Sequence, residues 1–471
     1  MMANKLAPEW LQEPKDANAF PATIWPRDAK RLGTGELELG GVPVSELTAQ
    51  FGTPLYVIDE DEFRARARSV KTAFDAAAKS IGSSAKVYYA GKVFLAGAVV
   101  RWVDELGLNV DVSSAGELAL ALASGIDPKK IGLHGNNKSL SEIGRAVSAG
   151  VGAIVVDSEI EIERIAAAAG AQERVQPVRL RVNTGVHAHT HEFLATARED
   201  QKFGIAMGDV PALVAKIRES NNLEFLGLHS HIGSQIFAPD GFVEAAKRLI
   251  KLHAELLKDG PVPELNLGGG FGINYTSADD APDIGEFARL ITDAVAAECS
   301  ARGIKVPALA FEPGRAIAGP AGVTLYTVGT IKDVNVDGSI RKYVSIDGGM
   351  SDNMRTALYQ AAYTVRLASR VSSADQALVR VVGRHCESGD IVVRDDYLPG
   401  DVSNGDTLVV AATGAYCFSL GNNYNFLTRP PVVAVRSGKA RLIVRGETEA
   451  DLFDRDVELH DKFASANKDQ S

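Results

Sequence analysis

Short apolar runs alternate with longer stretches of helical spacing through the middle of the chain. Eight of the runs are rich in β-branched and aromatic residues, as buried strands are: 86–90, 108–112, 131–134, 153–156, 178–182, 225–229, 264–267 and 308–311. The stretches between them place alanine and other apolar residues at helical spacing, as at 115–123, 139–149, 159–169 and 242–257. This α/β alternation predicts a (β/α)8 TIM barrel, with a doubly wound parallel sheet as the alternative.

The pattern changes on both sides of this region. Beyond residue 319, one helix is expected near 353–361 among short β-type runs at 324–330, 343–346, 379–382, 407–411, 432–435 and 441–445. Before it, strand candidates occur at 37–39 and 53–58, and Asp59 could cap a helix over 60–79. We therefore expect a barrel over 56–318 and a mainly-β domain over 319–471. The N-terminal segment, 1–55, should add strands to the β domain, because it is too short to fold alone.

Composition places the chain among soluble globular proteins. Its 471 residues are 45% hydrophobic and 23% charged, and their number favours two domains. The net charge of −10 comes without a basic run, which argues against nucleic acid and anionic membranes as partners. No apolar stretch has the length of a signal peptide core or a membrane span. Three irregularly spaced cysteines form neither a disulfide set nor a zinc motif, so we expect a cytoplasmic protein with reduced thiols.

Polar and glycine residues stand directly after the predicted strands. The catalytic groups of a (β/α)8 barrel lie at the carboxyl ends of its strands, where the following loops converge. The residues in that position are Lys92, 111–114, 135–137, Asp157, Asn183, 229–231, 268–270 and 312–315. We therefore expect an active site at this end of the barrel.

Lys92 follows the first barrel strand, with Gly91 before it and apolar residues around it. Burial disfavours a charged amine, and a neutral amine can form a Schiff base with a carbonyl. Taken alone, Lys92 is equally compatible with a surface lysine that closes a strand.

Two glycine-bearing loops predict a phosphate site. Gly268, Gly269 and Gly270 follow the seventh strand, where consecutive backbone N–H groups can approach an anion. In isolation they could be a simple turn, but barrels often bind phosphate with the loops after strands seven and eight. The eighth strand ends in Glu312, Pro313, Gly314 and Arg315. Glu312 could keep a pyridine nitrogen protonated and Arg315 could clamp a carboxylate, so lysine, glycines and acid together predict pyridoxal 5′-phosphate.

Further candidates have both functional and structural interpretations. His231 would stack on the cofactor ring and Ser234 would bind phosphate, although a lone strand-end histidine is often structural. Cys386, between a histidine and acids, could be reactive or inert core, and Tyr416 could offer its hydroxyl to phosphate or substrate. The alternating histidines 187, 189 and 191 lack acidic or sulfur partners, so we predict no metal site; the polar stretch 190–201 could be a lid.

In their order along the chain, these motifs resemble the diaminopimelate decarboxylase family. The family consists of fold-type III pyridoxal-phosphate decarboxylases with an alanine racemase-like architecture of barrel and β domain. The resemblance runs from Phe51 to Pro430, and its most specific motifs are 229–235, 268–272, 312–317, 386–390 and 414–418. One departure is Gly91-Lys92-Val93, where relatives often carry other small residues.

The resemblance implies roles for individual residues. Lys92 would bond the cofactor, and Gly270 with the 312–315 stretch would bind it. Tyr416 would touch cofactor and substrate, and Cys386 would be the catalytic proton donor. The substrate would be held by Arg315, Arg355, Tyr359 and Glu387. The family forms head-to-tail homodimers in which the Cys386 motif completes the partner's barrel site.

The activity implied is decarboxylation of meso-2,6-diaminopimelate to L-lysine and CO2, the last step of lysine biosynthesis. Arg315 and Arg355 can bind a distal carboxylate while Glu387 takes a distal ammonium, so a substrate lacking either group would leave buried charges unpaired. Three alternatives stay open. They are a decarboxylase for ornithine, arginine or a carboxylated polyamine; a racemase, which needs a second base; and a non-catalytic cofactor carrier, which has no need of Cys386, Glu387 or Arg355.

Overall fold

The computed structural model describes residues 4–186 and 202–459 and consists of two compact units. The barrel unit contains Arg64–Gly272 and Ala281–Ile317. The β unit contains Met1–Phe63, Ile273–Asp280 and Ala318–Ser471. The histidines 187, 189 and 191 and the possible lid at 190–201 lie outside the described residues.

The barrel unit is a closed ring of eight parallel strands, which confirms the predicted TIM barrel and excludes the doubly wound sheet. Pairing runs β9-β11-β12-β13-β5-β6-β7-β8, and β8 pairs with β9 to close the ring. The strands are β5 (Ala85–Ala90), β6 (Asn109–Val112), β7 (Ile131–Leu133), β8 (Ala153–Val156), β9 (Gln176–Asn183), β11 (Leu223–His229), β12 (Glu264–Asn266) and β13 (Ala308–Phe311). Each of the eight predicted runs forms one of these strands. A short strand, β10 (Ile205–Ala206), pairs with β9 outside the ring.

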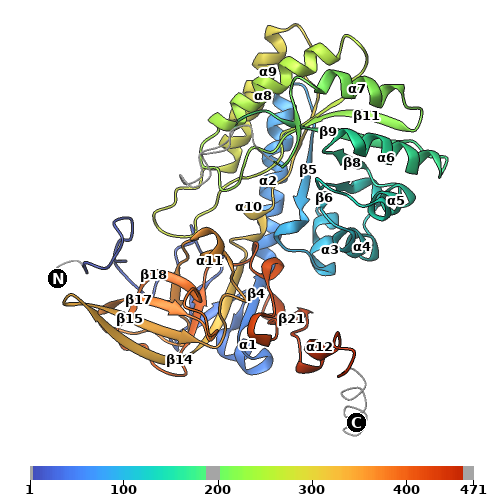
Figure 1. Ribbon diagram of the computed structural model, residues 1–471. Helices are drawn as coiled ribbons and strands as arrows, with labels where there is room; N and C mark the ends of the chain where they lie inside the picture. Colours follow the sequence, from blue (N-terminus) through green and yellow to red (C-terminus); the bar gives the residue numbers. More distant parts are fainter. Residues whose placement is uncertain (1–3, 187–201, 460–471) are drawn as a thin grey trace. The chain divides into compact units, whose positions relative to one another are not determined.

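Amphipathic helices surround these strands (Figure 1). They are α2 (Glu60–Ser80), α3 (Gly97–Glu105), α4 (Ala115–Ala123), α5 (Leu140–Ala149), α6 (Glu159–Gly170), α7 (Val210–Glu219), α8 (Asp240–Leu256) and α9 (Ile284–Ala301). Asp59 caps α2 as predicted, because its Oδ1 accepts the Glu62 N–H at 2.9 Å. Aromatic side chains pack strands to helices, and the rings of Phe74 and Phe311 stack with centroids 3.9 Å apart. This packing fixes the strand ends that carry the candidate site.

The β unit is built on a sheet ordered β18-β17-β15-β14-β4-β20-β21. Its strands are β4 (Leu55–Asp59), β14 (Gly322–Val336), β15 (Ser339–Ile346), β17 (Gln376–Val382), β18 (Ile391–Pro399), β20 (Val432–Arg436) and β21 (Lys439–Val444). Two more strands, β16 (Val365–Leu367) and β19 (Thr407–Val410), pair with each other, and β19 also pairs with β14. Since β4 lies between β14 and β20, the expected boundary at residue 56 falls inside this sheet.

The N-terminal segment belongs to the β unit, to which it was expected to add strands. It forms a separate three-stranded sheet of β1 (Lys30–Arg31), β2 (Leu37–Leu39) and β3 (Val42–Pro43), followed by α1 (Val44–Phe51). The helix expected near 353–361 is shorter, α11 (Arg355–Tyr359), and α12 (Glu449–Phe453) lies near the described C-terminal end. Within the described ranges, no helix is long and apolar enough to cross a membrane.

Candidate active site

The carboxyl ends of the barrel strands surround a cavity of about 520 Å³. Three predicted residues, Lys92, His231 and Glu312, line it. Other polar groups of the wall come from β6, β7, β9 and β11 or the loops after them, and are Asp111, Ser113, His134, Asn136, Arg181 and His229. The converging strand ends therefore form one polar chamber, as the barrel pattern predicts.

Lys92 sits in a single 3₁₀ turn, Gly91–Val93, at the exit of β5. Gly91 is required there, because a Cβ would lie 2.7 Å from the Asp111 carbonyl oxygen. The Lys92 side chain is exposed and reaches the cavity, so the burial expected from its apolar neighbours is wrong.

Glu312 is a buried carboxyl that lines this cavity. Its Oε1 accepts the Asn266 Nδ2–H at 2.8 Å and lies 3.1 Å from His229 Nε2 and 3.5 Å from His134 Nε2. Burial alone would raise the pKa of Glu312, but the adjacent imidazoles, His229 first, hold it well below its ordinary value. Glu312 is therefore an ionised carboxylate at neutral pH.

Asp111 is a second carboxyl with the opposite behaviour. Its Oδ1 lies 3.2 Å from His134 Nε2, in space that exists because residue 132 is glycine; a Cβ there would be 2.5 Å from this oxygen. Burial, and then the charge of Glu312, raises the pKa of Asp111 well above its ordinary value. The pKa values of the two carboxyls in the cavity wall are thus shifted in opposite directions.

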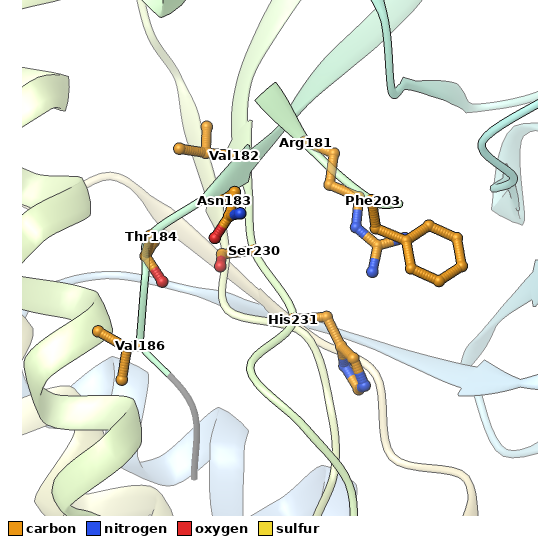
Figure 2. A pocket seen from close by; sticks show the side chains of 8 residues that line it. All are labelled: Arg181, Val182, Asn183, Thr184, Val186, Phe203, Ser230 and His231. Atoms are coloured by element: carbon orange, nitrogen blue, oxygen red, sulfur yellow. The ribbon is translucent and has the colours of Figure 1, made fainter. Parts of the chain in front are cut away.

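His231 is a neutral imidazole with a defined tautomer. Its Nδ1 accepts the Gly269 N–H at 3.3 Å, which places the ring proton on Nε2. Burial, and then the charge of Lys92, lowers the pKa of His231 well below its ordinary value. Figure 2 shows His231 at the edge of a small pocket of about 10 Å³, in which the Arg181 guanidinium lies 4.2 Å from the centre of the Phe203 ring.

The predicted glycine loop is needed chiefly for close packing. A Cβ on Gly268, Gly269 or Gly270 would approach a carbonyl oxygen to 2.5, 1.9 and 2.3 Å, respectively. The Gly268 and Gly269 N–H groups already donate to Asn266 Oδ1 and His231 Nδ1, so they differ from the open anion donors that the sequence suggested.

The loop after β13 packs against the Lys92 turn and the loop after β11. Pro313 accepts the Ala90 N–H at 3.1 Å, and a Cβ on Gly314 would lie 2.6 Å from Val93 Cγ1. Arg315 begins α10 (Arg315–Ala318), is buried, and donates from Nη2 to Ser234 Oγ at 2.8 Å. Ser234 and Arg315, which were both predicted to bind the cofactor, are therefore in direct contact.

The remaining predicted residues belong to the β unit. Arg355 is buried, and its guanidinium carbon lies 5.8 Å from the centre of the Tyr416 ring. Tyr416 has a φ of +67°, a conformation that non-glycine residues seldom adopt and that is common at functional sites. Tyr359, at the end of α11, is 65% exposed.

Cys386 and Glu387 lie on an exposed loop between β17 and β18. The preceding His385 is buried and fixes the loop: its Nε2 is 2.9 Å from Ser351 Oγ and its Nδ1 is 3.2 Å from Asn425 Oδ1. Cys386 is a free thiol, and its exposure contradicts the inert-core interpretation.

A search for related proteins identifies the family. The family described as "Pyridoxal-dependent decarboxylase, pyridoxal binding domain" matches residues 64–319. Diaminopimelate decarboxylase of Mycobacterium tuberculosis is 52% identical over 443 residues, which cover 92% of this chain and 98% of that protein. The chain belongs to the diaminopimelate decarboxylase family. The Bacillus subtilis member is 43% identical over 427 residues, covering 90% of this chain and 95% of that protein.

Solved structures of the diaminopimelate decarboxylase family have the same fold. The structure of the M. jannaschii enzyme in co-complex with L-lysine superimposes with a TM-score of 0.84 at 32% identity, covering 92% of this chain and 99% of that chain. The Helicobacter pylori enzyme complexed with L-lysine gives 0.80 at 27% identity, covering 88% and 99% of the two chains.

This diaminopimelate decarboxylase family member is an enzyme that uses pyridoxal 5′-phosphate. The barrel cavity fits that cofactor chemically. An ionised Glu312 suits a protonated pyridine nitrogen, a neutral His231 suits stacking on a ring, and Lys92 offers an amine. The cavity also contains His134, His229 and Glu312 with ligand atoms within 4.8 Å of one another, a group that could hold a metal ion. The same group would suit the ring nitrogen of pyridoxal 5′-phosphate, because the pKa of its carboxylate, Glu312, lies well below the ordinary value.

The sequence singled out no role for several groups of this cavity. Asp111 and His229 were among the strand-end residues expected in the active site, but without a role of their own. His134 ends its predicted strand, so the same rule could have found it. Asn266, which bonds Glu312, lies one residue before the end of its predicted strand and carried no such signal.

Proposed function

We propose that this decarboxylase removes the D-centre carboxylate of meso-2,6-diaminopimelate, giving L-lysine and CO2, the last step of lysine biosynthesis. The observation that carries the substrate assignment is Arg355, a buried cation with no carboxylate within 4.0 Å in the part of the chain that is described. A buried charge without an opposite charge beside it is costly, and a substrate with a carboxylate at its far end supplies the missing anion.

The barrel residues are assigned to the cofactor. Lys92 would bond it through its amine, Glu312 would hold a proton at the pyridine nitrogen, and His231 would stack on the ring. Ser234, Arg315 and the 268–270 and 313–314 backbone are assigned to the phosphate group. The Gly270 N–H has no partner among the described residues and is the donor that this loop offers. When bound, pyridoxal 5′-phosphate supplies the electron sink that makes loss of CO2 possible.

The β-unit residues are assigned to the substrate and to the final proton transfer. Arg355, with Arg315, binds the distal carboxylate, and Glu387 binds the distal ammonium. Tyr359 and Tyr416 complete the substrate contacts. The bond from Cα to the carboxylate breaks, CO2 leaves without the bonding electrons, and Cys386 Sγ–H gives its proton to Cα.

Two further parts of the proposal concern assembly and location. Cys386 and Glu387 are exposed on their own subunit, and the nearby Tyr424 and Phe426 are also exposed, at 43% and 65%. We assign this surface to a head-to-tail homodimer in which Cys386 serves the partner's barrel. A cytoplasmic location suits a proton donor that must stay a reduced thiol.

The test is turnover by the purified protein. With meso-diaminopimelate and cofactor, equal amounts of CO2 and L-lysine should form, and Lys92→Ala should abolish both. Turnover of ornithine or arginine in preference to diaminopimelate would contradict the substrate assignment and keep the reaction class.

A further inference from the structure

Arg355 lies inside a group of tyrosines that come from three separate segments of the β unit. Its guanidinium carbon is 4.9 Å from the centre of the Tyr275 ring, 5.7 Å from that of Tyr363 and 5.8 Å from that of Tyr416. These distances are within the range of cation–π attraction. We call these three side chains the tyrosine cage.

Tyr363 makes a directional hydrogen bond with the arginine. Its hydroxyl oxygen accepts the Arg355 Nη1–H at 2.5 Å and lies 3.6 Å from the buried Cys417 Sγ. The hydroxyl therefore has polar contacts with both Arg355 and Cys417, and either the hydroxyl or the thiol can donate in the second contact.

Tyr275 is fixed as a wall of the cage. Its ring meets that of Tyr363 edge-on, with centroids 5.1 Å apart and an interplanar angle of 78°. Its carbonyl accepts the Thr364 Oγ1–H at 2.9 Å, which ties residue 275 to the segment that follows Tyr363. Both tyrosines are almost fully buried.

A cage of this kind orients a cation without neutralising it. An aspartate or glutamate beside Arg355 would fix the guanidinium equally well, but it would cancel the charge that a substrate carboxylate needs. Ring faces and a phenol oxygen hold the guanidinium plane and leave its net charge available. Fixing the plane also removes the rotamer freedom that a long side chain would lose on binding.

We propose that Tyr363 and Tyr275 are positioning residues that set the specificity of this enzyme for a distal carboxylate, by holding Arg355 in its binding orientation. The inference rests on the proposed function. Neither tyrosine needs to touch the substrate, because both act through Arg355.

The test compares two ligands that differ in the distal carboxylate alone. L-Lysine retains that carboxylate after loss of CO2 from the D-centre, whereas 1,5-diaminopentane lacks it. In Tyr363→Phe, the inhibition constant of L-lysine and the KM for meso-diaminopimelate should rise about tenfold, as expected when a charged donor loses its partner. The inhibition constant of 1,5-diaminopentane and kcat should stay within about twofold of the wild-type values.

Tyr326→Phe is the matched control. Tyr326 is also a buried tyrosine of the β unit, but its hydroxyl has no hydrogen-bond partner in the described residues, so its loss should change none of these constants. For Tyr275, the ring is the group in contact, so Tyr275→Leu should weaken L-lysine binding more than Tyr275→Phe does. Thermal melting and cofactor content establish that each variant is folded.

The outcomes separate this inference from the proposed function. Equal effects of Tyr363→Phe on both inhibitors, or no effect on L-lysine, would overturn the positioning role. A wild-type enzyme that binds 1,5-diaminopentane as well as L-lysine, or that ignores meso-diaminopimelate, would instead contradict the substrate assignment on which the inference rests.

Discussion

Asp111 and Glu312 approach the same imidazole nitrogen, His134 Nε2, at 3.2 and 3.5 Å, yet they differ in charge. Glu312 has three polar neighbours that favour its ionised form, whereas both oxygens of Asp111 lack a hydrogen-bond donor among the described residues. The charge of one carboxylate disfavours ionisation of a second buried carboxyl near it. Keeping the proton on Asp111 preserves the negative charge of Glu312 for the ring nitrogen.

This division predicts different results for two isosteric substitutions. Asp111→Asn replaces a protonated acid with a neutral amide, so kcat should fall no more than about fivefold. Glu312→Gln removes the charge and should lower kcat about a hundredfold or more. Steady-state kinetics and titration of the cofactor-free protein with pyridoxal 5′-phosphate measure both effects. Equal losses in the two variants would mean that Asp111 also works as an anion.

Asp352, in the β unit, makes stability depend on pH. Burial raises its pKa to about 7, although the Gly349 N–H donates to its Oδ2 at 2.9 Å. The folded protein therefore keeps a proton that the unfolded chain releases above pH of about 4. The contribution of Asp352 to the free energy of unfolding is greatest below pH of about 4. It is lost as the pH rises to about 7.

Asp352→Asn should remove the loss of stability that the wild-type protein shows as the pH rises from about 4 to about 7. An amide oxygen still accepts the Gly349 N–H, and nothing ionises, so the variant should gain up to roughly 4 kcal/mol relative to wild type between pH 4 and pH 8. Calorimetric melting across this range measures the difference. Asp293→Asn, at an exposed aspartate, is the control and should leave the pH profile unchanged. If Asp352→Asn changed the melting temperature by the same amount at every pH, ionisation of Asp352 would not be the cause of the pH dependence.

The sequence predicted individual residues of the cavity, but it did not predict the environment of each residue. Strand ends identified Lys92 and Glu312 because parallel barrel strands bring their carboxyl ends together. The protonation of Asp111 depends on Gly132 on the next strand and on Glu312 across the barrel, which a linear pattern does not contain. Lys92 was expected to be buried because its neighbours are apolar, but the cavity beside it was not visible in the sequence.

At the scale of elements, a buried ion pair joins the loop after β7 to helix α6. Lys138 Nζ, in the loop after β7, lies 3.0 Å from Glu161 Oε2 on α6 and donates to the Gly135 and Val155 carbonyls at 2.6 Å each. Glu161 in turn accepts the Asp157 N–H at 2.8 Å. The pair therefore holds the wall that contains Gly135 against the end of β8.

Removing Lys138 from its ion pair with Glu161 should destabilise the protein. Lys138→Met leaves the Glu161 charge buried without its partner and should lower the free energy of unfolding by about 3–5 kcal/mol. Adding Glu161→Gln removes that charge while keeping an acceptor for Asp157, so the double variant should be more stable than Lys138→Met alone.

Lys216→Met serves as the control, because Lys216 pairs with Glu159 at the exposed surface and its loss should leave unfolding unchanged. Denaturant unfolding measures all three variants. A double variant that is less stable than Lys138→Met would show that hydrogen bonds, and not the unpaired charge, dominate.

The pattern of elements was predictable wherever burial alone determines it. All eight barrel strands are apolar and were found, but β18 was missed because it contains Asp395 and Asp396. Both aspartates are buried and paired with arginines, Asp395 with Arg341 at 2.8 Å and Asp396 with Arg366 at 3.1 Å. Pairing across strands makes acidic positions compatible with a sheet interior, and it depends on residues far away in sequence.

At the scale of the whole molecule, shared sites in a dimer predict complementation between inactive variants. Lys92→Ala and Cys386→Ala should each be inactive alone. Co-expressed, they form mixed dimers in which one barrel has its lysine and receives the partner's cysteine, so roughly half of the wild-type activity per dimer should return. Activity per dimer after co-purification through two different tags measures it. No recovery in a verified mixed dimer would contradict sites completed in trans.

The place of β4 in its sheet has a consequence for biosynthesis. Both edges of β4 pair with strands made much later: β14 begins at residue 322 and β20 at residue 432. The whole barrel unit is translated between β4 and β14. A ribosome therefore releases a complete set of barrel strands while β4 still exposes unpaired backbone groups, which are prone to non-native pairing. One of the first strands to be synthesised is among the last to be protected, and we expect nascent chains to need chaperones most over this interval.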